Sequence, residues 1–467
     1  MAAITLNEST IPVIRGRFVG DVLEEGDPGY DEARSIFNGM IDRRPRLIVR
    51  CTGAADVVAG VLLARETGLP LAICGGGHGV NGFAVCDDGL MLDLSPMKRI
   101  DVDPEERTAR AQAGVTWGEF DAATQAHGLA TTGGRISTTG IAGLTLGTGS
   151  GWLERKLGFA ADNLIAADVV TADGRLVHAS EDENADLLWG LRGGGGNFGV
   201  VTDFTYRLHE VGPTILGGMI VWPIEQAGEV FRAYRELMAE APDEIGGAGA
   251  ILTAPPAPFL PAELHGTHVA AVITAAFTTL ERGAELLRPI RELGSPAADV
   301  VGPMPYTALQ QLVDASNPAG LYNYWKAELV QELPDELIDK VIAHSEGMRS
   351  PHSVMFIQPL GGALARIPED ACAITARSAP WALHGIGEWV TPEESEYELE
   401  WVRAWGRMVE PYKVAGIPMT FSADAGDERV RATYGEEKYA RLVALKDKYD
   451  PDNLFRLNQN IKPSSAA

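Results

Sequence analysis

Residues 74–82 read Cys74-Gly75-Gly76-Gly77-His78-Gly79-Val80-Asn81-Gly82, directly after the apolar, strand-like segment Leu69–Ile73. Consecutive glycines let backbone N–H groups approach a phosphate closely, because no Cβ stands in the way. A histidine within such a loop lies beside whatever group the loop binds. The stretch therefore predicts a diphosphate-binding loop with a reactive ring held next to its imidazole.

Two other interpretations compete with this one. Gly77-x-Gly79-x-x-Gly82 formally matches the dinucleotide fingerprint of nicotinamide enzymes, which must open a helix. Here the turn signal Asp87-Asp88-Gly89 and the strand-like run Leu90–Leu94 follow instead, so that interpretation is rejected. A tight surface turn with an ordinary histidine remains open for the loop taken alone, because short motifs often match by chance.

The composition is that of an acidic globular chain. Its 467 residues predict two domains, and 64 acidic against 39 basic residues give a formal charge of −25. This charge argues against binding to nucleic acid or to an anionic membrane. Residues 1–5 lack the basic and apolar regions of a signal peptide, and no apolar run is long enough to span a bilayer. We therefore expect a cytoplasmic protein.

The four cysteines show no paired metal-binding spacing. In a cytoplasmic protein such residues are expected to be reduced and buried. The sequence therefore predicts no disulfide and no metal site at Cys51, Cys74, Cys86 or Cys372.

The first part of the chain alternates strands and helices, which predicts an α/β opening. A helical lead-in is expected over residues 1–45, and Ala54–Thr67 is expected to form a helix that Gly68 closes. A further helix is expected at Thr116–His127. Strands are expected at Leu47–Arg50, Leu69–Cys74, Leu90–Leu94, Thr108–Ala113, Leu164–Thr171, Arg175–His178 and Val200–Leu208.

Beyond residue 212 the glycine clusters become rarer, and strand-like runs alternate with helical ones. Residues 213–410 are therefore interpreted as a second domain, an antiparallel sheet that carries helices, and residues 411–467 return to helix and loop. The strand-like runs are Val269–Phe277, Tyr322–Leu329 and Ser353–Leu360, and the helical ones are Ala227–Met238, Leu280–Leu293 and Asp335–Glu346.

Four segments resemble the berberine-bridge-enzyme-like branch of the vanillyl-alcohol-oxidase flavoproteins, in the order and spacing of that family. They are Gly75–Gly82 with the trailing Leu92–Met97, Gly140–Asn163, Trp189–Val201 and Tyr449–Asn460. The resemblance implies an α+β protein with a PCMH-type FAD-binding domain of two α/β subdomains, formed by residues 1–212 and 411–467. Residues 213–410 would be the substrate domain, an antiparallel sheet flanked by helices.

The resemblance also implies covalent FAD, because the family joins a histidine at the position of His78 to the flavin 8α-methyl group. The family often adds a cysteine in Gly-x-Cys-Pro-Thr-Val-Gly, but here the run is Gly134-Arg135-Ile136-Ser137-Thr138-Thr139-Gly140. With Ile136 in place of the cysteine, we expect one covalent link. The other implied cofactor contacts are Gly75, Gly76, Gly77, Gly79, Gly82, Thr138, Thr139, Gly140, Gly143, Leu144, Gly147, Gly149, Asn163, Gly199, Val201 and Asn458.

The resemblance does not supply a catalytic base. Many relatives use a tyrosine in Tyr-x-Asn-Phe, whereas this chain has Pro418-Met419-Thr420-Phe421, and proline cannot act as a base. Strand alternation puts Gln358 on one face of a segment expected to point toward the flavin, and puts Tyr322 and Tyr324 together on one face of another. These three residues are the catalytic candidates. For the tyrosines, a solvated edge strand is the alternative.

Together these features predict an FAD-dependent oxidase. It would move a hydride from an alcohol, an amine or an activated C–H group to flavin N5, and dioxygen would reoxidise the flavin. Phe356, Ile357 and Met419 favour an aromatic or polyketide-like small molecule over a sugar. The alternatives are a dehydrogenase with another acceptor, a sugar oxidase, and a flavin-binding protein that has lost its catalytic base.

Overall fold

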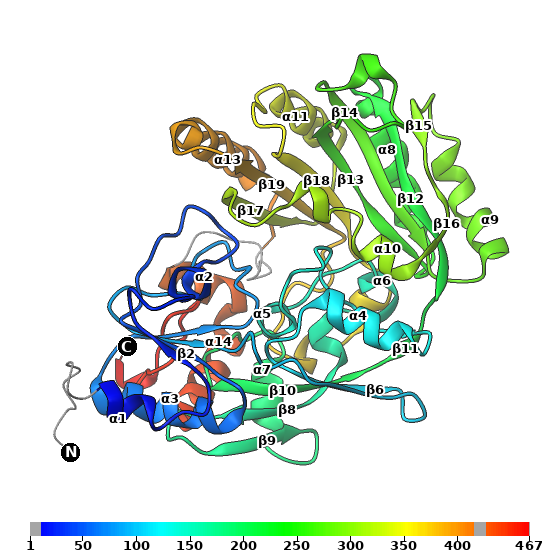
Figure 1. Ribbon diagram of the computed structural model, residues 1–467. Coiled ribbons are helices and arrows are strands. Elements are labelled where there is room, and N and C mark those ends of the chain that lie inside the picture. The colour runs from blue at the N-terminus through cyan, green and yellow to red at the C-terminus, as the bar shows by residue number, and fades with distance from the viewer. Residues whose placement is uncertain (1–10, 415–425, 467) are drawn as a thin grey trace.

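The computed structural model describes residues 11–414 and 426–466 (Figure 1). One hydrophobic core combines residues between Ile11 and Leu208 with residues between Val430 and Ile461. A second core is built from residues between Leu216 and Val409. The two ends of the chain therefore pack together, and the middle of the chain has a core of its own.

A small, mostly parallel sheet with the order β1-β2-β4-β3 carries the glycine loop. Helix α3 (Ala54–Thr67) crosses from β2 to β3 and ends at Gly68, whose φ of 72° is the left-handed conformation expected of a C-cap. The helical lead-in is wrong in part: over residues 11–45, the described part of that segment, the helices are the short α1 (Ile11–Arg15) and α2 (Tyr30–Arg34). Between them lies an edge strand that pairs with β2. The strands are β1 (Val22–Leu23), β2 (Leu47–Arg50), β3 (Leu71–Cys74) and β4 (Leu90–Asp93).

An antiparallel sheet with the order β5-β6-β10-β8-β9 forms the second layer of this part. The hairpin predicted at Ala172-Asp173-Gly174 joins β8 to β9. Helix α4 (Trp117–Gln125) begins after Thr116, which forms a capping box with Glu119. The strands are β5 (Ile100–Asp103), β6 (Thr108–Gln112), β8 (Leu164–Val170), β9 (Leu176–Ser180) and β10 (Val200–Arg207), with α5 (Ile141–Gly147), α6 (Glu154–Leu157), α7 (Ala185–Leu191) and α14 (Asp427–Tyr449) beside them.

A large antiparallel sheet dominates the middle of the chain, with the order β15-β12-β14-β13-β18-β19-β17 and β16 beside β12. Helices α8, α9, α11 and α13 cover its outer face, and the other face points toward the first part (Figure 1). The strands are β12 (Thr214–Pro223), β13 (Ile245–Thr253), β14 (His268–Ala276), β15 (Ala298–Asp299), β16 (Gly302–Pro305), β17 (Tyr322–Val330), β18 (Val354–Pro359) and β19 (Trp381–Trp389). The helices are α8 (Ala227–Glu240), α9 (Leu280–Arg291), α11 (Asp335–Ser345) and α13 (Ser395–Val409).

Shorter elements join the two parts. Strands β7 (Leu129–Ala130) and β11 (His209–Glu210) pair with each other, while α10 (Tyr306–Gln310) and α12 (Ala363–Arg366) lie between the larger layers. All four cysteines are buried and unpaired. Within the described ranges, no helix is both long enough and apolar enough to cross a lipid bilayer.

Candidate active site

A cavity of about 1200 Å³ lies where the inner face of the large sheet meets the glycine loops. A drug-sized ligand fills a pocket of roughly 300–1,000 Å³, so this volume is large enough for a cofactor together with a substrate. Its wall combines segments that are far apart in the sequence. They lie within residues 71–84, 134–152, 195–201, 250–273, 312–325, 351–386 and 455–459, and Leu94 and Met219 also line the cavity.

The glycine loop that follows β3 contacts a second glycine cluster, which lies within residues 133–151, main chain to main chain. A Cβ atom on Gly76 would lie 2.3 Å from the amide nitrogen of Gly140, and a Cβ on Gly140 would lie 2.5 Å from that of Gly76. Neither position can therefore carry a side chain without moving the main chain. Gly77, with a φ of 67°, adopts a conformation that favours glycine. These glycines serve the close approach of one loop to the other, and the predicted approach of their N–H groups to a phosphate stays a prediction.

His78 lies in the cavity wall and is held by residues outside its own loop. Its ring stacks on Phe37, with ring centroids 4.1 Å apart and an interplanar angle of 21°. Nε2 lies 2.8 Å from the Thr138 hydroxyl, and Nδ1 lies 3.3 Å from the Thr139 hydroxyl. Burial lowers the pKa of His78 to about 4, so the imidazole is neutral near pH 7. A neutral imidazole has a lone pair and can act as a nucleophile.

Most of the predicted cofactor residues line this one cavity, and four do not. Of those four, Thr138 instead contacts His78, and Gly149 packs against Ala160 with a φ of 86°. Asn163 donates hydrogen bonds to the carbonyls of Leu157 and Phe159. The fourth is Gly82, with a φ of 74°. None of these four residues lines the cavity. Those that line it are Gly75, Gly76, Gly77, His78, Gly79, Thr139, Gly140, Gly143, Leu144, Gly147, Gly199, Val201 and Asn458.

The cavity wall fits a large group that has both flat and polar parts. A Cβ atom added at Gly143 or Gly196 would meet no atom within 4 Å, so the main chain is exposed to the cavity there. The Asn458 side chain lines the cavity, and its buried Oδ1 has no hydrogen-bond partner among the residues that the structure describes. A buried polar atom without a partner is costly, and a bound polar ligand would satisfy it. These features suit a flavin dinucleotide.

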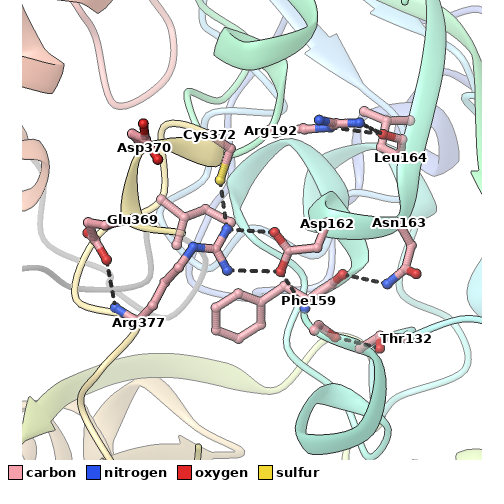
Figure 2. Close-up of polar contacts among 12 residues, drawn as sticks. Thr132, Phe159, Asp162, Asn163, Leu164, Arg192, Glu369, Asp370, Cys372 and Arg377 are labelled. Atoms are coloured by element: carbon pink, nitrogen blue, oxygen red, sulfur yellow. Dashed lines mark hydrogen bonds and ion pairs between the residues drawn. The ribbon is translucent and has the colours of Figure 1, made fainter. Parts of the chain in front are cut away.

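A buried ion pair joins the turn at Asp162 to the loop that contains Arg377 (Figure 2). The guanidinium of Arg377 donates to both carboxylate oxygens of Asp162, at 2.6 and 3.0 Å, and also contacts Cys372. The Asp162 carboxylate in turn accepts the backbone N–H of Phe159 at 2.9 Å, at the start of a 3-10 turn. This cluster fixes the turn that contains Asn163.

A polar network closes another part of the cavity wall, which is otherwise apolar. The amide nitrogen of Gln358 donates to Glu154 at 2.5 Å and to Ser150 at 2.9 Å, so its oxygen faces Nε2 of His384 at 3.0 Å. This arrangement assigns the ring proton of His384 to Nε2. Burial, reinforced by the charge of Arg135, lowers the pKa of His384 to about 3, so the ring is neutral.

Arg135 completes this network. It donates to Glu154 at 2.9 Å and to Ser150 at 3.1 Å, and its guanidinium lies 4.8 Å from the ring centre of Trp152. The ring centre of Phe356 lies 5.8 Å from the same guanidinium and 6.4 Å from that of Trp152. Because Glu154 neutralises it, Arg135 brings hydrogen-bond donors and a flat surface to the cavity without a net charge.

The two tyrosines predicted as catalytic lie on the opposite face of the large sheet. Tyr324 packs among the helices of the second core and lies beneath the guanidinium of Arg403, and neither tyrosine lines the cavity. Tyr322 contacts the ring of Trp389. Trp325, the residue after Tyr324, points to the other face of the strand and lines the cavity instead. The predicted face of this strand is therefore the helix-covered one. The third candidate, Gln358, is buried behind His384.

Some residues at the candidate site were not predicted from the sequence. His384 lies on β19, and Arg135 and Glu154 flank the second glycine cluster. Alternation within Trp381–Trp389 puts His384 and Ile386 on one face and could have identified them. The run Pro418–Phe421, with Met419, lies outside the described residues. Within the described ranges, no group of three or more His, Cys, Asp or Glu side chains could hold a metal ion.

Comparison with known proteins identifies related chains. The FAD-binding-domain family matches residues 45–180, and the berberine and berberine-like family matches residues 412–462. The FAD-linked oxidoreductase YvdP of Bacillus subtilis (strain 168) is 30% identical over 459 residues, which are 96% of this chain and 99% of that protein. The (R)-6-hydroxynicotine oxidase of Paenarthrobacter nicotinovorans is also 30% identical, over 96% of this chain and 97% of the relative.

Solved structures give the same result for the fold. The 6-hydroxy-D-nicotine oxidase from Arthrobacter nicotinovorans superposes with a TM-score of 0.84 and 27% identity, over 96% of this chain and 98% of that one. A chitooligosaccharide oxidase superposes with a TM-score of 0.85 at 22% identity, over 98% of this chain and 100% of that one, and supports the fold alone. This chain is an FAD-linked oxidoreductase of the berberine-bridge-enzyme-like family.

Proposed function

We propose that the protein is an oxidase that carries one covalently bound FAD on His78 and oxidises an aromatic or other largely apolar small molecule. The observation that carries this proposal is the single cavity whose wall contains both the neutral imidazole of His78 and the apolar surface around His384. When bound, FAD supplies the two-electron chemistry, taking a hydride from a substrate carbon and passing the electrons to dioxygen.

The attachment requires a nucleophile on the protein, and His78 has the properties for this role. An imidazole nitrogen would form a C–N bond to the 8α-methyl carbon, with loss of one C–H and one N–H proton. The two electrons released would remain on the flavin until dioxygen takes them up, with two protons, as hydrogen peroxide. A single link is expected because Ile136 lines the cavity where relatives carry a cysteine.

The wall opposite the glycine loops favours an apolar substrate. Trp152, Trp325, Phe356 and Ile386 present ring and aliphatic surface there, and a sugar would need a polar partner for each hydroxyl group. The Nε2–H of His384 is used by Gln358, so the nitrogen that carries the lone pair is Nδ1. His384 is therefore a neutral side chain in this part of the wall, and its low pKa makes it a weak base.

Two measurements test this function. Intact-mass measurement of the denatured protein should show one added FAD, and His78→Ala should show none. A substrate panel should then bleach the flavin with aromatic alcohols or amines, and stopped-flow mixing with aerated buffer should restore the colour. Bleaching by oligosaccharides alone would contradict the substrate class, and a reduced flavin that persists in air would contradict the oxidase.

A further inference from the structure

The groups that hold the His78 imidazole belong to a short turn on another loop. Ser137, Thr138 and Thr139 form this turn, and both ring nitrogens of His78 face its hydroxyl groups. The turn is closed by the amide of Thr139, which donates to the carbonyl of Ile136 at 3.1 Å. In the family pattern a proline and a valine stand where this chain has Ser137 and Thr139, and neither side chain can make such contacts.

The same turn is held from the substrate side of the cavity. Ser137 donates both its backbone N–H and its hydroxyl to the carboxylate of Asp314, at 2.8 and 2.5 Å. Asp314 begins a 3-10 turn, Asp314–Ser316, in the middle part of the chain, 177 residues further along the sequence. Two hydrogen bonds to one carboxylate fix both the position and the orientation of the residue that donates them.

A second contact joins the same two segments. The side-chain amide of Gln310 donates to the carbonyl of Gly134 at 3.3 Å and to the buried carboxylate of Asp121 at 2.8 Å. The loop that contains this turn is therefore hydrogen-bonded at Gly134 and at Ser137 to residues 310–314 of the middle part. Among the described residues, the hydrogen bonds and the ring contact of His78 go to Thr138, Thr139 and Phe37, so we expect the influence of that stretch on the imidazole to pass through the turn.

We propose that Asp314 and Thr139 are positioning residues for flavin attachment, and that docking of the large-sheet part through Asp314 makes the His78 imidazole competent to bond the cofactor. This inference rests on the proposed covalent FAD. Bond formation is fast only when the reacting atoms are held at contact distance in the correct orientation. Without the turn, the ring of His78 would keep only its stacking on Phe37, and rotation about its side-chain bonds would be freer.

The test follows attachment itself and does not need a substrate. Apoprotein produced under riboflavin limitation is mixed with FAD, and the covalently bound fraction is followed by intact mass after denaturation. The variants are Asp314→Ala and Thr139→Val, the second of which removes one hydroxyl and keeps the shape. Gln311→Ala, an exposed position on the same segment outside the cavity wall, is the matched control. Flavin fluorescence quenching reports non-covalent binding in every variant.

We expect the wild type and Gln311→Ala to attach FAD at the same rate. Asp314→Ala and Thr139→Val should bind FAD but attach it about tenfold more slowly, the factor that corresponds to loss of one hydrogen bond of ordinary strength. Attachment at the wild-type rate in both variants overturns the inference and leaves covalent FAD in place. If the wild type never attaches FAD, or if His78→Ala attaches it equally well, the proposed function itself fails.

Discussion

Removal of Arg377 tests how firmly the loop over residues 369–379 is held to the first part of the chain. Its guanidinium and the Asp162 carboxylate are 2% and 7% exposed and share two hydrogen bonds (Figure 2). Substitution Arg377→Met keeps most of the apolar volume but leaves Asp162 buried without its cation. Breaking a buried pair in this way costs about 3–5 kcal/mol, because the remaining charge has lost both water and its partner.

The loss should be visible locally, since the loop around Arg377 packs on the first part of the chain. The indole of Trp189 donates to the carbonyl of Asp370, and the amide of Ala373 donates to that of Arg192. Hydrogen exchange followed by mass spectrometry measures the free energy of such local opening. In Arg377→Met, amides of residues 369–379 should exchange at least about a hundredfold faster, which corresponds to the lower end of that cost.

A matched control and a double variant make the test specific. Arg366 and Asp243 form the same kind of ion pair at an exposed position, so Arg366→Met should leave the exchange of residues 369–379 unchanged. Asp162→Asn combined with Arg377→Met removes both charges and should exchange more slowly than Arg377→Met alone. Exchange in Arg377→Met within about fivefold of the wild type would show that the buried pair contributes little.

Three further outcomes follow from the cavity wall. Gly76→Val should abolish FAD binding, measured as the ratio of visible to ultraviolet absorbance, because its side chain would strike the main chain of Gly140. Gln358→Leu removes the acceptor that faces the Nε2–H of His384 and the donor to Glu154, and should slow flavin reduction by about 5- to 150-fold in anaerobic stopped-flow experiments, a loss of about 1–3 kcal/mol. Burial raises the pKa of Glu388 from 4.5 to about 8. Between these two pH values the folded state keeps the carboxyl proton that the unfolded state has released, so the free energy of unfolding falls as the pH rises from about 4.5 to about 8. Glu388→Gln should therefore show a thermal midpoint that falls less than that of the wild type between pH 5 and 9.

The sequence predicted the elements whose patterns are local. Helix α3 begins and ends where its caps predict, and the hairpin at Ala172-Asp173-Gly174 forms. The lead-in over residues 1–45 was predicted poorly because short helices and an edge strand are held there by tertiary contacts, such as the two hydrogen bonds from the backbone of Val19 and Gly20 to Asp56. Propensity over a few residues does not report such contacts.

The catalytic candidates show a different limit. Alternation correctly groups Tyr322 with Tyr324, yet it does not say which face of a strand meets the cavity and which meets a helix. In the structure α13 covers the tyrosine face, and Gly387, which pairs with Tyr324 in the neighbouring strand β19, leaves room for Val402 of α13. The network of Arg135, Glu154 and His384 joins three segments from both parts of the chain, and no local pattern predicts such a meeting.

The single covalent link can be tested by restoring the cysteine that relatives carry. Ile136 lines the same cavity as His78, and the adjoining turn already contacts the imidazole. If Ile136→Cys puts a thiol beside the bound flavin, His78→Ala combined with Ile136→Cys should keep flavin after denaturation, whereas His78→Ala alone should release it. Ile136→Ser with His78→Ala controls for the smaller side chain. Complete release of flavin from the cysteine variant would show that the position of Ile136 does not approach the ring, and that the turn holds the imidazole without aligning the rest of the loop with the cofactor.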